Sequence, residues 1–352
     1  MTRSGRDGGS CGPTEESTLG RVPGPADMPV SRSGVLFSLV VTFYNQREFV
    51  RAALDSALAQ QRDTLEIIAV DDGSTDGTQD VLGEYGDAIR IVLLDENQGV
   101  SAARNRGVAE ATGMYLLFLD GDDTLPPWAI DVYETLANAK RPVIMMGRYF
   151  WFEGELPEPA DFPPEIRFVE YGDYFEKDRS VGARAGAMAV ARWAFDEVGG
   201  WTREIAAGED CDLVWRLGVV GPVIYIIEPT TTFHRSHADQ TIRRTSLMFE
   251  SMMNLIRNEK EGRYPGGRKR SFERRACVGG AAFNWALAIR HGSHAHAARL
   301  LTRSWAYVLA AVVLRLRVRV RGLRPTQALA LSTAGSQPNA RQAASANASD
   351  SS

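Results

Sequence analysis

Two apolar segments that end abruptly in acidic clusters constrain the fold of this chain most strongly. Residues 65–70 lead directly into Asp71, Asp72 and Gly73, and residues 115–119 lead into the acidic segment 120–123. Short runs rich in Ile, Val, Leu and Phe that are bounded by Gly and Asp predict buried strands. Both acidic clusters are therefore expected at strand ends, where open α/β sheets bind their ligands.

The second cluster is suited to a cation. Side chains alternate along an extended backbone, so Asp120 and Asp122 are expected to point to the same side, about 7 Å apart. Hard carboxylate oxygens favour magnesium or manganese. A solvated acidic loop is the alternative that the local sequence leaves open.

The first 120 residues alternate between strand and helix patterns. This alternation predicts an α/β fold with a doubly wound, mostly parallel sheet and helices on both faces, in a domain over residues 34–256. The periodicity alone indicates no chemistry. The expected strands are 37–42, 65–70, 89–94 and 115–119, and the expected helices are 49–58, 79–85 and one that begins near 99.

Composition separates the two ends from this domain. Residues 1–33 are rich in Gly, Pro, Ser and Arg and lack the apolar core of a secretory signal, and residues 325–352 are mostly Ala, Ser, Gln and Asn, so both are predicted to be disordered tails. The three cysteines, Cys11, Cys211 and Cys277, are too few and too far apart for a disulfide framework or a zinc site. A reducing cytosol is the simplest compartment for this chain.

The net charge of −4 hides a strong asymmetry. Residues 257–324 hold 16 Lys or Arg against three acids, a net charge of +13, whereas residues 34–256 hold 19 against 36, a net charge of −17. The basic segment is expected to form a largely helical extension, with an apolar run at 305–314 that is too short to span a bilayer. Two interpretations stay open: residues 299–324 contact an anionic membrane surface, or they pack on the body or on a partner subunit. No nucleic-acid recognition motif accompanies the charge, so nucleic acid is not an expected partner.

Five segments, taken together, resemble glycosyltransferase family 2. The resemblance implies a GT-A fold, a nucleotide-sugar donor carrying UDP or dTDP, a divalent metal (Mn²⁺ or Mg²⁺) and inversion at the anomeric carbon. It does not cover the two tails or the basic extension. The segments, in chain order over residues 37–240, are 37–45, 70–78, 97–105, 118–123 and 207–210.

The resemblance assigns nucleotide-sugar contacts to several positions. Asp72 would accept the imide N–H of uracil or thymine, although a turn-forming Asp before Gly is an ordinary local alternative. Arg104 would reach the diphosphate or orient Asp120, and a surface salt bridge is its alternative. The remaining residues implied to contact the donor are Thr42, Tyr44, Asn45, Asn105, Asp120 and Arg235.

The same resemblance assigns the catalytic and metal-binding roles. Asp210 is implied to be the general base, with Glu209 orienting it or the acceptor; N-capping of the following helix is the local alternative. Asp120, Asp122 and His237 are the implied metal ligands, with Asp122 the more direct one. The histidines His291, His294 and His296 lack a nearby carboxylate and are interpreted as surface residues.

The predicted reaction is the transfer of a single hexose-type sugar to a hydroxyl acceptor on a glycan or lipid-linked precursor of a surface polysaccharide. The signature of processive synthases and their multiple membrane spans are absent from the sequence. Residues 150–180, rich in aromatic side chains, cover the stretch in which the family varies its acceptor site, although core packing explains them equally. The expected location is the cytoplasm, peripheral to the inner face of the membrane. The alternative function is a non-catalytic member of the same fold that binds nucleotide or scaffolds a membrane complex.

Overall fold

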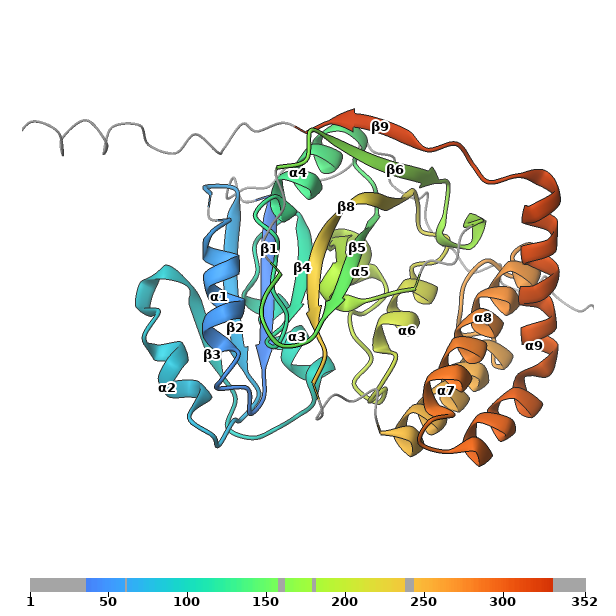
Figure 1. The fold of residues 1–352 in the computed structure, drawn as a ribbon, viewed down its shortest axis with the longest axis horizontal. Coiled ribbons are helices and arrows are strands. Elements are labelled where there is room, and N and C mark those ends of the chain that lie inside the picture. Colours follow the sequence, from blue (N-terminus) through green and yellow to red (C-terminus); the bar gives the residue numbers. More distant parts are fainter. Residues whose placement is uncertain (1–35, 61, 158–161, 179–181, 238–243, 332–352) are drawn as a thin grey trace, which may run out of the picture.

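The chain folds around one mixed sheet, seen in a computed structural model that describes residues 36–331 except 61, 158–161, 179–181 and 238–243 (Figure 1). In this described part the sheet has nine strands, in the order β3-β2-β1-β4-β7-β5-β8-β6-β9. Strands and helices alternate through the first half of the chain, as predicted. The predicted fold class, an α/β sheet with helices on both faces and a helical C-terminal extension, is confirmed.

The four N-terminal strands are all parallel to one another, as the alternation predicted. Every residue of the central strand β1 is buried, so both faces of the sheet must be covered at this point. The elements of this half are β1 (Phe37–Phe43), α1 (Val50–Leu58), β2 (Leu65–Asp71), α2 (Thr78–Gly83), the short η2 (Gly86–Ala88), β3 (Arg90–Leu93), α3 (Val100–Glu110), β4 (Tyr115–Asp120) and α4 (Ala129–Lys140).

The strand register aligns the polar ends of these strands. Thr42 of β1 pairs with Asp120 of β4 on one side, and Phe43 pairs with Asp71 of β2 on the other. The carboxyl ends of β1, β2 and β4 therefore finish at one edge of the sheet. This edge is where an open α/β sheet binds ligands.

The second half of the sheet is mixed. β7 (Met188–Ala191) runs antiparallel between β4 and β5 (Ile144–Phe152), and β5 pairs in parallel with β8 (Val223–Arg235). β6 (Glu165–Tyr171) lies antiparallel to β8. The remaining elements here are η3 (Tyr174–Glu176), η4 (Ala185–Ala187), α5 (Arg192–Glu197) and α6 (Glu209–Arg216).

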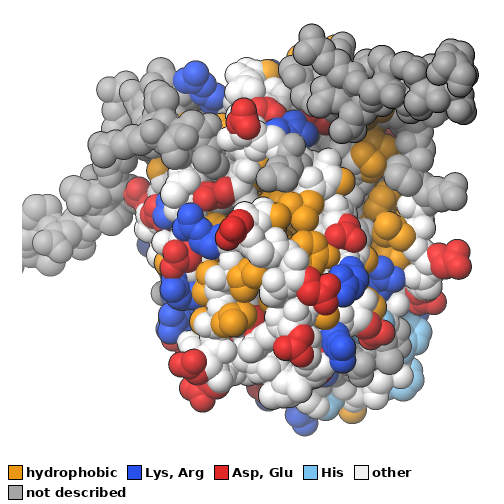
Figure 2. All heavy atoms as spheres, turned by 90° about the vertical axis from the view of Figure 1, so that its left-hand side faces the viewer, with side chains coloured by type: hydrophobic (Ala, Val, Ile, Leu, Met, Phe, Trp, Pro, Cys, Tyr) orange, Lys and Arg blue, Asp and Glu red, His pale blue; other side chains and the backbone are white. Residues whose placement is uncertain are grey.

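The basic extension is helical, as predicted. It contains α7 (Thr245–Lys260), α8 (Ser271–Ile289) and α9 (His294–Arg321), which pack against one another at the end of the molecule beyond α6 (Figure 1). The predicted domain boundary at residue 256 falls inside α7, so this helical layer begins earlier than expected. The opposite end of the molecule, on the α2 side, carries acidic and basic side chains interspersed with apolar ones (Figure 2).

The predicted start of the C-terminal tail at residue 325 is wrong. Residues Gln327–Ala330 form β9, which pairs antiparallel with β6 and adds the last strand at that edge of the sheet. The unpaired backbone groups of β6 at the edge of the sheet hydrogen-bond to residues 327–330. The Ala- and Gln-rich composition of this segment does not predict such a strand. Residues 332–352, and the tail predicted at 1–33, lie outside the described residues.

Candidate active site

The acidic loop after β4 lies tightly against the end of β1. A Cβ atom on Gly121 would lie 2.2 Å from Cδ1 of Phe43 and 2.6 Å from Oε1 of Gln46, so only glycine allows this approach. The loop therefore presents Asp120 and Asp122 at the sheet edge where β1, β2 and β4 end. The Asp120 side chain is 36% exposed there.

Arg104 of α3 joins two of the predicted site residues. Its guanidinium is almost fully buried, donates one hydrogen bond to Asp120 Oδ1 at 2.6 Å and another to Glu209 Oε1 at 2.8 Å, and lies over the ring of Trp201. Burial lowers the pKa of Arg104, but the two carboxylates raise it further, so the side chain stays charged. Of the two roles left open from the sequence, orienting Asp120 is the one that these contacts support.

The same ion pair acts on Asp120. Burial raises the pKa of this carboxyl, but Arg104 outweighs burial and the pKa is lowered overall. Asp120 is therefore held as a carboxylate at neutral pH. A charged oxygen ligand is what a hard divalent cation requires.

Asp210 lies in the first turn of α6, directly after Glu209. Burial, and then the charge of Glu209, raise the pKa of Asp210 to about 6, against the opposing effect of Arg184. A carboxylate with a pKa near 6 is mostly ionised at pH 7 and remains a competent proton acceptor. The N-cap of α6 is Gly208, so N-capping does not explain Glu209 or Asp210.

Asp122 is oriented from the end of β8. His237 Nε2 lies 2.8 Å from Asp122 Oδ2, and Arg235 donates from Nε to the backbone oxygen of Asp122 at 3.3 Å. The Arg235 guanidinium also donates to Gly154 O and lies over the rings of Phe49 and Phe152. Both residues therefore support the acidic loop in this arrangement, whereas the sequence predicted diphosphate contact for Arg235.

A divalent metal fits this loop through two oxygen ligands. Burial, and then the neighbouring charge of Asp120, raise the pKa of Asp122, and a divalent cation between the two carboxylates would offset their repulsion. No group of three His, Cys, Asp or Glu residues in the described part of the chain is already arranged as a metal cage. His237 Nε2 is hydrogen-bonded to Asp122 in this structure, so the role of His237 as a third metal ligand stays a prediction.

The predicted nucleotide-binding residues line the ends of β1 and β2. Asp72 is buried and accepts hydrogen bonds from the backbone N–H groups of Gln98 and Gly99, at 2.8 and 2.9 Å. Asp71 accepts from Ser74 N and Gln79 Nε2 through Oδ2, but its buried Oδ1 lacks a hydrogen-bond partner in the described structure. The buried Oδ1 of Asp71, a residue that the sequence analysis did not select, is therefore a carboxylate oxygen without a hydrogen bond at the end of β2.

The loop after β1 adds the remaining predicted contacts. Thr42 is buried at the end of the strand, and Tyr44 exposes its ring next to it. Asn45 has a positive φ of 51° and accepts a hydrogen bond from Thr75 N through its side chain, so it joins this loop to the one after β2. Thr42 and Tyr44 are therefore placed at the ligand edge, and Asn45 holds the loop in shape.

Asn105 is used differently from the prediction. Its side-chain amide donates to Trp201 O at 2.8 Å and its side-chain oxygen accepts from Trp201 N at 3.0 Å. These two bonds tie α3 to the loop that precedes α6. Asn105 therefore positions the segment that carries Asp210, and its predicted contact with the donor stays a prediction.

Sequence reasoning missed a cationic and aromatic cluster beside Asp210. Arg184 lies over the rings of Tyr149 and Trp151, with its Cζ atom 5.4 and 4.9 Å from their centroids. Burial lowers the pKa of Arg184, but Asp210 and Tyr149 raise it overall. A lone arginine in a Gly- and Ala-rich stretch carries no sequence signal, because the contact joins segments 35 residues apart.

A second missed pair is Asp123 with His234. His234 Nδ1 contacts Asp123 Oδ2, and its buried Nε2 lacks a hydrogen-bond partner in the described structure. Burial raises the pKa of Asp123 to about 6 despite the opposing effect of His234. Asp123 and His234 directly adjoin Asp122 and Arg235 in the sequence, and only the latter two were predicted site residues.

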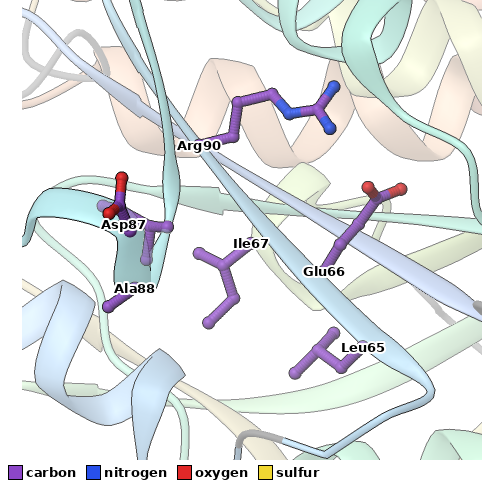
Figure 3. A pocket seen from close by; sticks show the side chains of 7 residues that line it. Leu65, Glu66, Ile67, Asp87, Ala88 and Arg90 are labelled. Atoms are coloured by element: carbon purple, nitrogen blue, oxygen red, sulfur yellow. The ribbon is translucent and has the colours of Figure 1, made fainter.

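A hollow of about 380 Å³ lies elsewhere, at the start of β2 and β3 (Figure 3). Leu65, Ile67 and Arg90 are among its lining residues. β2 begins at this hollow and ends at Asp71, so the hollow and the candidate site lie at opposite ends of the same strand. It contains none of the predicted site residues.

Comparison with known proteins finds a family match over part of the chain. Residues 38–199 match the family model described as Glycosyl transferase family 2, so the resemblance seen in the sequence is confirmed. TuaG of Bacillus subtilis (strain 168), whose name assigns it to teichuronic acid biosynthesis, is 42% identical over 139 residues, which are 38% of this chain and 52% of TuaG. An uncharacterized glycosyltransferase of Rickettsia felis is 35% identical over 234 residues, 62% of this chain and 37% of that protein. The chain thus spans about half the length, or less, of these curated relatives.

A solved structure supports the fold assignment. The chain superposes on Staphylococcus aureus TarS 1–349 in complex with UDP-GlcNAc with a TM-score of 0.54 and 13% sequence identity, over 83% of this chain and 93% of that one. At this identity the likeness concerns the fold.

Proposed function

Because residues 38–199 match the family model described as Glycosyl transferase family 2, we propose that this chain transfers a single sugar from a nucleotide-sugar to a hydroxyl group of an acceptor, with inversion at the anomeric carbon. One observation carries the proposal. Arg104 holds Asp120, from the acidic loop, and Glu209, the neighbour of Asp210, through one buried guanidinium. This bridge brings the donor side and the base side of a transferase into one charged network.

In this proposal the donor lies over the ends of β1 and β2. Tyr44 offers an exposed ring face for the base, and Asp72 is the carboxylate that would accept the imide N–H of uracil or thymine. The TarS structures, which contain UDP or UDP-GlcNAc, support a UDP-linked donor. A dTDP-linked donor satisfies the same imide recognition.

Asp120 and Asp122 would hold the divalent metal, Mn²⁺ or Mg²⁺. When bound, the metal neutralises the diphosphate and stabilises the charge of the leaving group. His237 and Arg235 keep Asp122 in position from the end of β8. Arg104 keeps Asp120 ionised and aligned.

Asp210 removes the proton from the acceptor hydroxyl. The deprotonating oxygen attacks the anomeric carbon, the bond to the nucleoside diphosphate breaks on the opposite face, and the configuration inverts. A pKa of about 6 leaves Asp210 ionised at pH 7. Glu209, fixed by Arg104, sets the direction of the helix turn that presents Asp210.

The acceptor would approach from the side of Arg184, Tyr149 and Trp151. The two aromatic rings offer faces for a sugar, and the guanidinium offers a donor for a hydroxyl or an anionic group. The names of the relatives, which include enzymes of teichuronic acid and teichoic acid synthesis, support a precursor of a cell-surface polymer as the acceptor class. A lipid-linked precursor would place the reaction at the cytoplasmic face of the membrane.

Titration calorimetry tests the donor site first. We expect UDP or dTDP to bind the purified chain more tightly with Mn²⁺ than without it, and Asp122→Asn to abolish the metal-dependent part. The nucleotide that binds then defines the panel of sugars for a turnover assay. If neither nucleotide binds, the transferase proposal is refuted, and the alternative function, a non-catalytic scaffolding protein of the same fold, is favoured.

A further inference from the structure

Helix α9 has one face that is packed and one that is not. Its packed face is made of Ala297, Leu300, Ser304, Tyr307 and Ala311, which are buried. The backbones of α8 and α9 touch where Gly279 meets Tyr307, because a Cβ atom on this glycine would lie 1.9 Å from the Tyr307 carbonyl oxygen. This side of α9 is therefore buried within the helical layer.

The other face is apolar and exposed. Its side chains recur at intervals of four, three, four and four residues, which places them on one side of a helix that turns 100° per residue. They are between 45% and 88% exposed. We call this set the outer stripe; it consists of Trp305, Leu309, Val312, Leu316 and Val320.

Only positive charges border the outer stripe. α9 contains no Asp or Glu, and its six arginines are all exposed. Although these arginines alternate with apolar residues in the sequence, the helical turn of 100° per residue distributes them to both sides of the stripe, with Arg315 and Arg319 on one side and Arg299 and Arg317 on the other. Arg317 also lies over the ring of Phe272 on α8.

We propose that α9 lies flat on an anionic lipid bilayer, with the outer stripe in the interfacial region and the bordering arginines on the headgroups. Leu and Val side chains gain by leaving water, and Trp favours the interface between acyl chains and headgroups. Each arginine near an anionic surface adds a favourable contribution. The acidic body of the chain, with a net charge of −17 over residues 34–256, stays on the side away from the lipid.

Charge selects lipid over the other occupants of such a face. A second copy docked through the same stripe would bring arginines against arginines, because a two-fold interface pairs identical surfaces. Among the described helices, α9 is the one long and apolar enough to cross a membrane, but its packed face is held by α8. Lying on the surface uses the exposed face and leaves the packing on α8 intact.

Vesicle co-sedimentation of the full chain tests the proposal. We expect binding to phosphatidylcholine vesicles that contain about one third phosphatidylglycerol and little binding to phosphatidylcholine alone. Leu309→Gln should weaken binding by about fivefold, since it removes one half-exposed leucine from the stripe. Leu93→Gln is the matched control, because Leu93 is also 53% exposed but lies on β3 at the other end of the molecule. It should bind as the unchanged chain does.

The electrostatic part has its own variant. Arg299→Gln combined with Arg319→Gln should weaken binding to the anionic vesicles by about tenfold or more at low salt, and added salt should remove most of that difference. Equal losses for Leu309→Gln and Leu93→Gln, or no vesicle binding at all, would overturn the proposal. A dimer in sedimentation equilibrium that Leu309→Gln dissociates would overturn it in favour of a second copy.

The outer stripe and the candidate active site are separate parts of the molecule. The outer stripe contains no residue of the candidate active site, so UDP or dTDP binding in the absence of vesicles should be the same in all these variants. Nucleotide binding without vesicle binding would refute only the membrane face. Vesicle binding without nucleotide binding would refute only the transferase.

Discussion

Replacing Asp210 with asparagine should abolish turnover and, at alkaline pH, stabilise the folded chain. Burial and the adjacent Glu209 raise the pKa of Asp210 from 3.8 to about 6. A rise of about two pH units corresponds to about 3 kcal/mol against the ionised form in the folded state. Asn carries no charge, and its side-chain oxygen can still accept the hydrogen bond that Cys211 N donates to Asp210.

The sign of the pH dependence follows from proton binding. Between about pH 4 and pH 6 the folded chain holds a proton on Asp210 that the unfolded chain has released, so ionisation of this group lowers the free energy of unfolding as the pH rises through that window. At pH 8 the full cost of about 3 kcal/mol is present. Near pH 4 it is absent, and the unchanged chain and Asp210→Asn should be almost equally stable.

Urea unfolding followed by tryptophan fluorescence at pH 8 and pH 4 measures this difference. Asp212→Asn is the matched control on the same helix, since Asp212 is buried but accepts hydrogen bonds from Thr202, Arg216 and Tyr264. That control should be less stable than the unchanged chain at both pH values.

Turnover supplies the second readout. A general base contributes about 10²- to 10⁴-fold, so Asp210→Asn should lose at least about a hundredfold in kcat, and the unchanged chain should lose activity as the pH falls through about 6. A variant that is less stable than the unchanged chain at pH 8 would refute the buried-charge reasoning. Near-normal turnover would show that the base is another group.

Two further variants probe the charged network. Arg104→Gln leaves Asp120 and Glu209 without the guanidinium that pairs with both, so we expect the free energy of unfolding to fall by about 3 kcal/mol in urea unfolding. We also expect the loss of metal-dependent nucleotide binding in calorimetry. Arg104→Lys should recover part of the stability but not both contacts, and stability equal to that of the unchanged chain in both variants would contradict the bridge. Arg184→Gln should raise the KM for the acceptor by about tenfold and leave the KM for the nucleotide-sugar unchanged, measured by steady-state kinetics with each substrate varied; the opposite pattern would place Arg184 on the donor side.

Much of the sheet and its ligand edge followed from local sequence. The strands at 65–70 and 115–119 were predictable because a parallel strand that is buried on both faces is apolar throughout. The Asp residues that follow each apolar run mark the carboxyl ends of these strands. Once parallel pairing aligns Thr42 with Asp120, the acidic loop and the end of β1 must meet. Resemblance then added Glu209 and Asp210, which no local pattern connects to that edge.

The rest depends on contacts between distant segments. Arg184 has no local sign of function, and its meaning comes from Tyr149 and Trp151 across the site. β9 exists because β6 leaves an unpaired edge, which a composition rich in Ala and Gln cannot reveal.

The same logic explains why the basic end was ambiguous in the sequence. An apolar run beside alternating arginines fits both a packed helix and a membrane surface, since either environment buries Leu and Val side chains. In the structure one helix has two different sides: Tyr307 and its neighbours are buried against α8, and Trp305 and its neighbours are exposed. Packing and surface contact are therefore compatible in α9, because a helix that buries one side on its own protein still has another side to give to a lipid.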